Sequence, residues 1–116
     1  MDLKGLQKYQ EDFDNKHGFP VSVSTVPEKY LQISKDLVGL FGEIGEFANI
    51  VKKVNLSLDR STALAAPLES IETSLKEELV DSLIYLIRIA TILQLDLEEE
   101  YLRKITLNEE KYRGYK

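Results

Sequence analysis

Apolar positions recur every three or four residues through most of the chain, which is the period of an amphipathic helix. A first helix is predicted from residue 3 to about residue 17, where Gly18 and Pro20 end it. Residues 21–26 alternate apolar and hydroxyl side chains, but no second strand exists to pair with them. We therefore interpret them as an extended connector.

A single long helix is predicted over about residues 27–54, with Pro27 in its first turn and Thr25 or Val26 near its cap. Three glycines lie inside this helix, and each costs about 1 kcal/mol relative to alanine in a helix interior. They are Gly39, Gly42 and Gly45. Small residues at these positions would let another helix or a ligand approach closely.

The stretch from residue 55 to about residue 67 is polar and small, and we predict a long loop there. The next helix starts either near Glu69 or at Ser74, where Glu77 completes a capping-box pattern. It continues to about residue 93 and is apolar on nearly all sides, which is typical of a bundle centre or a subunit interface.

A last helix is predicted over about residues 97–112, opened by the capping-box pair Asp96 and Glu99. The predicted fold class is therefore all-α: a helical bundle of about four helices, two short and two long, completed by oligomerisation. The length of 116 residues suits a single domain over residues 1–116.

Composition removes several functional classes. The net charge of −5 argues against binding to a nucleic-acid backbone. The absence of cysteine excludes disulfides and thiolate metal sites. No apolar run reaches the roughly 18 residues of a membrane span, and the N-terminus does not resemble a signal peptide. We therefore expect a cytoplasmic protein that binds neither membrane nor nucleic acid.

Two pairs of carboxylates lie inside otherwise apolar helical segments. Glu43 and Glu46 are three residues apart, as are Glu78 and Asp81, so each pair shares one helix face. Carboxylates in apolar helices need a partner, and a divalent metal ion is the simplest one. A metal held in this way usually faces phosphate. Taken alone, either pair is more often a solvated face than a metal site.

The last helix carries a second candidate feature. Lys104, Asn108 and Lys111 follow one another at spacings of four and three, and can contact phosphate oxygens. An exposed charged face is the alternative reading of these three residues. The single histidine, His17, lies at a helix end where a cationic side chain is favoured, and we interpret it as structural.

These motifs resemble those of the MazG-like, all-α nucleoside triphosphate pyrophosphohydrolases. The family pattern is a Glu-x-x-Glu on one helix and a Glu-x-x-Asp on the next. In this chain Gly42–Ala48 and Lys76–Leu86 carry it, and the likeness spans roughly residues 30–113. The closing Lys104-x-x-x-Asn108-x-x-Lys111-Tyr112 is similar to the family's basic-aromatic signature.

The resemblance implies a Mg²⁺-dependent enzyme, with Mn²⁺ as the alternative metal. It would cleave a nucleoside triphosphate to the monophosphate and pyrophosphate, as a house-cleaning enzyme that controls the nucleotide pool. Carried over, the metal ligands and catalytic residues are Glu43, Glu46, Glu78 and Asp81. The phosphate contacts are Lys104, Asn108 and Lys111. The family builds its site from more than one subunit, which implies a homodimer or homotetramer.

The chain departs from the family pattern at two places. Gly42 stands where many members have a further glutamate, and the connection over residues 55–73 is longer than the minimal version. The base and sugar preference is therefore open. Two alternatives remain: a related phosphoribosyl-ATP pyrophosphohydrolase, and a non-catalytic helical interaction module. A ferritin-like di-iron site is unlike this pattern, because it needs Glu-x-x-His pairs and His17 lies in neither acidic helix.

Overall fold

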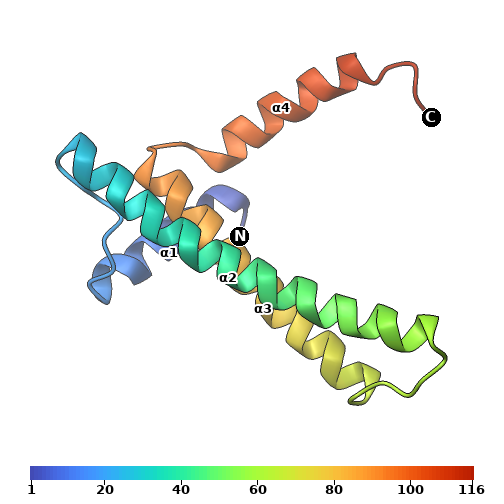
Figure 1. Cartoon of the computed structure of the whole chain (residues 1–116). Coiled ribbons are helices and arrows are strands. Elements are labelled where there is room, and N and C mark those ends of the chain that lie inside the picture. The colour runs from blue at the N-terminus through green and yellow to red at the C-terminus, as the bar shows by residue number, and fades with distance from the viewer. The chain divides into compact units, whose positions relative to one another are not determined.

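The computed structural model describes residues 1–116 and contains four α-helices and no strand (Figure 1). The helices are α1 (Leu3–Lys16), α2 (Val26–Asp59), α3 (Leu68–Ile92) and α4 (Leu97–Lys111). The prediction of an all-α helical bundle with two short and two long helices is confirmed. None of the helices combines the length and the apolarity that a membrane crossing requires.

Side-chain caps fix where three of the helices begin. The Asp2 carboxylate accepts the Gly5 N–H at 2.8 Å, and the Thr25 hydroxyl accepts the Glu28 N–H at 3.3 Å. At α4 the Asp96 carboxylate accepts the Glu99 N–H at 3.1 Å, as the capping-box pattern predicts. Each cap satisfies a backbone donor that the first helical turn leaves free.

The loop predicted from residue 55 was wrong over residues 55–59, which continue α2. Nothing in this stretch breaks a helix, because it contains neither glycine nor proline. The helix ends where Ser61 takes the left-handed conformation, with φ 52°, and the Thr62 N–H donates to the Ser57 carbonyl at 2.9 Å. The earlier of the two predicted starts for α3 is confirmed, so Ser74 lies inside the helix.

The chain forms two compact units. Unit 1 comprises Met1–Gln32 and Ile87–Lys116, and unit 2 comprises Ile33–Leu86. The buried apolar residues of unit 1 are Val21, Ile87, Ala90 and Ile92. Unit 1 therefore joins the two ends of the chain around a small core, whereas unit 2 is continuous in sequence.

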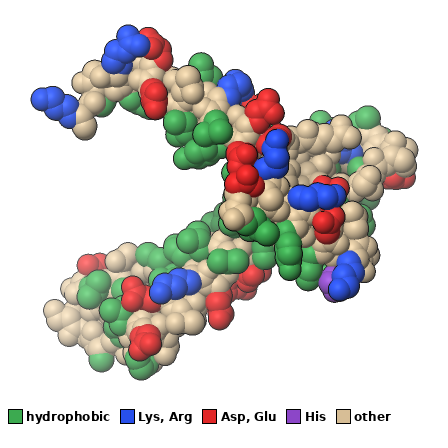
Figure 2. All heavy atoms as spheres, turned by 180° about the vertical axis from the view of Figure 1, so that it is seen from behind, with side chains coloured by type: hydrophobic (Ala, Val, Ile, Leu, Met, Phe, Trp, Pro, Cys, Tyr) green, Lys and Arg blue, Asp and Glu red, His purple; other side chains and the backbone are tan.

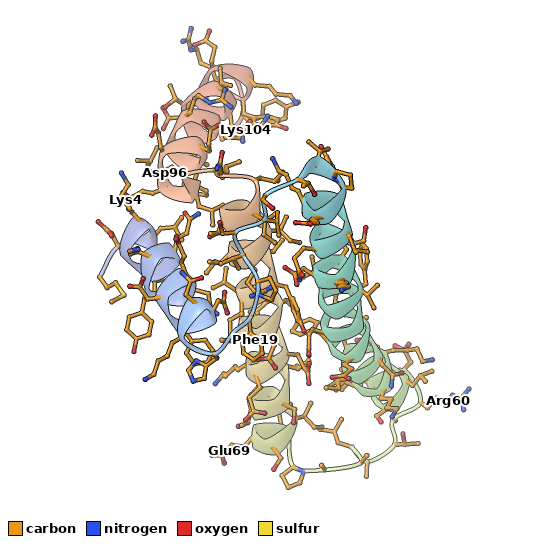
Figure 3. All side chains as sticks on the ribbon, turned by 90° about the vertical axis from the view of Figure 1, so that its left-hand side faces the viewer. Lys4, Phe19, Arg60, Glu69, Asp96 and Lys104 are labelled. Atoms are coloured by element: carbon orange, nitrogen blue, oxygen red, sulfur yellow. The ribbon has the colours of Figure 1, made fainter.

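One amide side chain connects α1 to the turn between α3 and α4. Gln7 donates to the Thr91 hydroxyl at 3.3 Å and to the Leu95 carbonyl at 2.7 Å, and it accepts the Leu97 N–H at 3.1 Å. The Lys4–Asp96 salt bridge of 3.0 Å lies beside it, and both residues are labelled in Figure 3. These bonds fix the start of α4 against α1.

A buried ion pair crosses unit 1. The Arg88 guanidinium lies 3.1 Å from the Asp14 carboxylate, and the two residues are only 7% and 2% exposed. Arg88 also donates to the Pro20 carbonyl at 2.9 Å, and the Gln10 amide donates to Asp14 at 3.0 Å. The pair therefore holds α1, the connector and α3 together at one point.

Unit 2 is an antiparallel hairpin made by most of α2, from Ile33 to its end, and most of α3 (Figure 1). The two helices meet closely where the Tyr85 ring lies on Gly39. A Cβ atom on Gly39 would lie 2.3 Å from the Cζ atom of Tyr85. Glycine is therefore required at this crossing, which explains one of the three glycines.

We expect Gly39→Ala to lower the free energy of unfolding by about 1–3 kcal/mol, because the new methyl group overpacks the Tyr85 contact. Gly42→Ala and Gly45→Ala are the matched controls. Apart from the neighbouring residues and the backbone of the same helix, no atom lies within 4 Å of either new methyl group, so each should be neutral or stabilise the helix by up to about 1 kcal/mol. Urea unfolding of the three variants measures the difference. Equal effects at all three positions would contradict the close crossing.

Candidate metal centre

Three of the four predicted carboxylates meet between the two helices of unit 2. Glu43 and Glu46 of α2 and Glu78 of α3 each offer a carboxylate oxygen, and these oxygens all lie within 4.8 Å of one another. The geometry follows from the sequence, because Glu43 and Glu46 share one face of α2 and the hairpin brings Glu78 opposite. Three acidic groups at this separation repel one another unless a proton or a cation lies among them.

Glu78 is the member of the group that α3 contributes. It is half-buried, and one of its carboxylate oxygens is buried without a hydrogen-bond partner. The pKa of Glu78 is raised to about 7, first by its hydrogen bond to Glu43, then by the loss of hydration and by the neighbouring Glu46. An unpartnered buried oxygen among carboxylates is a position that a cation would satisfy.

The raised pKa of Glu78 predicts a pH-dependent stability of the metal-free protein. The folded chain holds a proton on Glu78 up to about pH 7, whereas the unfolded chain releases it near 4.5. The stabilisation that this proton gives the folded chain is therefore complete below pH 4.5 and is lost as the pH rises through 7. We expect Glu78→Gln to melt at a higher temperature than the parent chain near pH 8, with a difference that narrows toward pH 5. Thermal unfolding followed by circular dichroism in a chelator tests this, and a constant difference would contradict it.

Asp81 is the fourth predicted ligand, and it does not belong to the group of three. It lies one turn beyond Glu78 on α3 and is exposed. Its spacing places it on the same side of α3 as Glu78. The predicted role of Asp81 as a metal ligand stays a prediction.

The predicted phosphate contacts lie on α4, in unit 1. Lys104 and Lys111 are exposed, Asn108 is half-buried, and the three follow one face of the helix. The Lys111 ammonium lies 5.3 Å from the centroid of the Tyr112 ring, which is a cation–π distance. The carboxylate group belongs to unit 2, so the seven predicted site residues are divided between the two units.

The structure adds a feature that the sequence interpretation missed. A cavity of about 400 Å³ lies in unit 2 beneath the connection between α2 and α3. Its walls are mainly apolar, and Lys53 and Ser57 are the polar residues that line it. Lys53 follows Glu46 by seven residues, which is two helical turns on one face. That spacing was visible in the sequence, but the fold of residues 63–65 over the helix was not.

Comparison of the chain with protein-family profiles, with curated proteins and with solved structures finds no match in any of the three.

Proposed function

We propose that this protein is a Mg²⁺-dependent nucleoside triphosphate pyrophosphohydrolase, which converts a nucleoside triphosphate to its monophosphate and pyrophosphate. The observation that carries the proposal is the group of three carboxylates, Glu43, Glu46 and Glu78, in the seam of the hairpin. The motif resemblance and the position of a basic-aromatic signature on α4 support it.

The donor set suits Mg²⁺ better than a softer metal. All three groups are carboxylates, and the chain has no cysteine and only one histidine, in α1's C-terminal cap. Mg²⁺ prefers oxygen ligands and keeps several waters, so three carboxylates leave positions for phosphate oxygens. A bound cation would also provide a partner for the buried oxygen of Glu78 that accepts no hydrogen bond.

The bound metal would supply charge neutralisation of the polyphosphate and a more acidic water. The chain's own residues have complementary tasks. Glu43, Glu46 and Glu78 bind the ion, and Asp81, exposed on the next turn of α3, is available as a further ligand or as the group that orients the attacking water. In this proposal Lys104, Asn108 and Lys111 bind phosphate oxygens and hold the triphosphate in register.

The deciding experiment is pyrophosphate release from a panel of ribo- and deoxyribonucleoside triphosphates, with and without Mg²⁺. Metal-dependent release that favours certain bases is the expected result. Release of inorganic phosphate instead would show cleavage at a different phosphoanhydride bond. If a folded sample releases nothing from any member of the panel, the enzyme assignment fails and the interaction module becomes the better reading.

We further propose that a second copy of the chain covers the hairpin. Only Leu40 of the apolar residues in unit 2 is more than nine-tenths buried, whereas many others are exposed. Figure 2 shows hydrophobic side chains along this part of the chain. The exposed ones include Ile44 of α2 and, on one face of α3 at spacings of four and three, Leu79, Leu83 and Leu86. A two-helix hairpin with such a face gains a core by pairing with an identical hairpin in a four-helix arrangement.

We expect Leu83→Glu to convert the proposed dimer or tetramer to monomers, because it places a charge in the middle of this face. Leu83 is 43% exposed in the single chain, so the substitution removes few contacts within the monomer. Leu107→Glu, at an exposed leucine of α4, is the matched control and should keep the assembly intact. Sedimentation velocity measures both. A monomeric parent chain would contradict the proposal directly.

A further inference from the structure

We propose that the cavity beneath the connection between α2 and α3 is the nucleobase site, and that it favours a base that carries an apolar substituent. The inference rests on the proposed function, because the carboxylate group sets where the phosphates lie.

The cavity has the size and the surface for a ring rather than for a charged group. Its volume of about 400 Å³ suits a small ligand, and its walls expose mainly apolar atoms. They are formed by residues of α2, the connection and α3, including Ile50, Val54, Ala63, Leu64, Ala65 and Ile71. All of them belong to unit 2, as does the carboxylate group. Figure 3 shows the two ends of the connection at Arg60 and Glu69.

The position of the cavity relative to the carboxylates matches the length of a nucleotide. Ile50 and Lys53 follow Glu46 by four and seven residues, so all three lie on one side of α2. The seven-residue step is about 10 Å along the helix. On α3, Ile71 precedes Glu78 by the same seven residues. A triphosphate bound at the carboxylates can therefore extend its nucleoside along the seam into the cavity.

Lys53 supplies positive charge at this position. It lines the cavity and forms no salt bridge. An ammonium group on the face shared with Glu46 can bind an oxygen of the phosphate that joins the nucleoside to the metal-bound end. Its neighbour Lys52 does not line this cavity and faces a different part of the surface. The two lysines form a natural test pair.

The apolar walls predict which bases bind best. Ser57 and Lys53 are the polar side chains in the lining, so the site offers few groups that could read the edge of a base. Selection then depends on buried apolar area. One additional methyl group is worth about a fourfold gain in affinity when it is buried. A 5-methylated pyrimidine should therefore bind about four times more tightly than the same base without the methyl group.

The test uses the α,β-methylene analogues of dTTP and dUTP, which differ by one methyl group and resist cleavage at this bond. Calorimetry with Mg²⁺ should give about fourfold tighter binding of the dTTP analogue to the full chain. Ala65→Leu, which fills the cavity, should remove this ratio while binding of inorganic tripolyphosphate stays unchanged. Ala63→Leu serves the same purpose if Ala65→Leu melts at a much lower temperature. Lys53→Gln should weaken both analogues, and Lys52→Gln neither.

The outcomes separate the two proposals. A ratio near one in the parent chain, or an unchanged ratio in a folded Ala65→Leu or Ala63→Leu variant, overturns the nucleobase site, whether or not triphosphates are cleaved. Equal effects of Lys52→Gln and Lys53→Gln overturn the role of Lys53. If the analogues bind with the expected ratio and the cavity variants abolish it, but no triphosphate is cleaved, the base site stands and the pyrophosphohydrolase assignment fails.

Discussion

Glu46→Gln is expected to reduce metal-dependent pyrophosphate release by about a thousandfold or more. The substitution keeps the shape of the side chain but removes one of the three carboxyl groups whose oxygens lie within 4.8 Å of one another. A thousandfold loss corresponds to about 4 kcal/mol of transition-state stabilisation, a reasonable share for a metal that neutralises the phosphate charge. Initial rates at saturating Mg²⁺, with kcat and KM determined separately, provide the measurement.

Two further substitutions test whether the loss of activity is specific to the residues of the site. Glu77→Gln alters the exposed neighbour of Glu78, which is outside the carboxylate group, and should retain nearly full activity. Asp81→Asn tests the residue that the structure leaves outside the group, and the proposed function expects a loss similar to that of Glu46→Gln. A fully active Asp81→Asn enzyme would remove Asp81 from the site and count heavily against the proposed function.

Removal of one partner from the Asp14–Arg88 pair should have the largest effect on stability. Arg88→Met leaves the Asp14 carboxylate 2% exposed and without its guanidinium, so we expect a loss of about 3–5 kcal/mol in the free energy of unfolding. That loss is a large part of the total stability of a domain of this size. Urea unfolding at neutral pH measures it.

The matched control is a second ion pair of the same unit. Arg103 and Glu100 lie 2.7 Å apart on the surface of α4, and Arg103→Met should cost less than about 1 kcal/mol. The double variant Asp14→Leu with Arg88→Met should recover much of the loss, because neither member of the pair is then left as a buried charge without the other. If Arg88→Met costs no more than Arg103→Met, the buried pair is unimportant for stability.

The helices could be predicted from the sequence because their signals are local. The three-to-four spacing of apolar residues and the Asp96 cap depend on neighbours within one or two turns. The end of α2 was misplaced, because polar composition alone does not stop a helix. The helix ends instead at the left-handed Ser61 and the backbone hydrogen bonds around it.

The candidate site was predictable in part for the same reason. Glu43 and Glu46 could be paired by their spacing, and the hairpin required for Glu78 to meet them followed from the order of the helices. The partner of Arg88 was not predictable, since Asp14 lies far away in sequence on a helix that looked ordinary. The cavity likewise depends on how residues 63–65 fold back over α2, which no periodic pattern encodes.

The discontinuity of unit 1 has a consequence for the order in which the protein folds during synthesis. Residues 33–86 are contiguous, so the hairpin can pair as soon as α3 has left the ribosome. The side-chain amide of Gln7, in contrast, can form its hydrogen bonds to Leu95 and Leu97 only after these residues are made, about ninety residues later. Even the buried Asp14–Arg88 pair needs Arg88, which follows the last residue of the hairpin, so α1 lacks its contacts with the end of α3 when the hairpin is already complete. A chain cut short after Leu86 would therefore leave its first helix exposed to proteases while the hairpin persists.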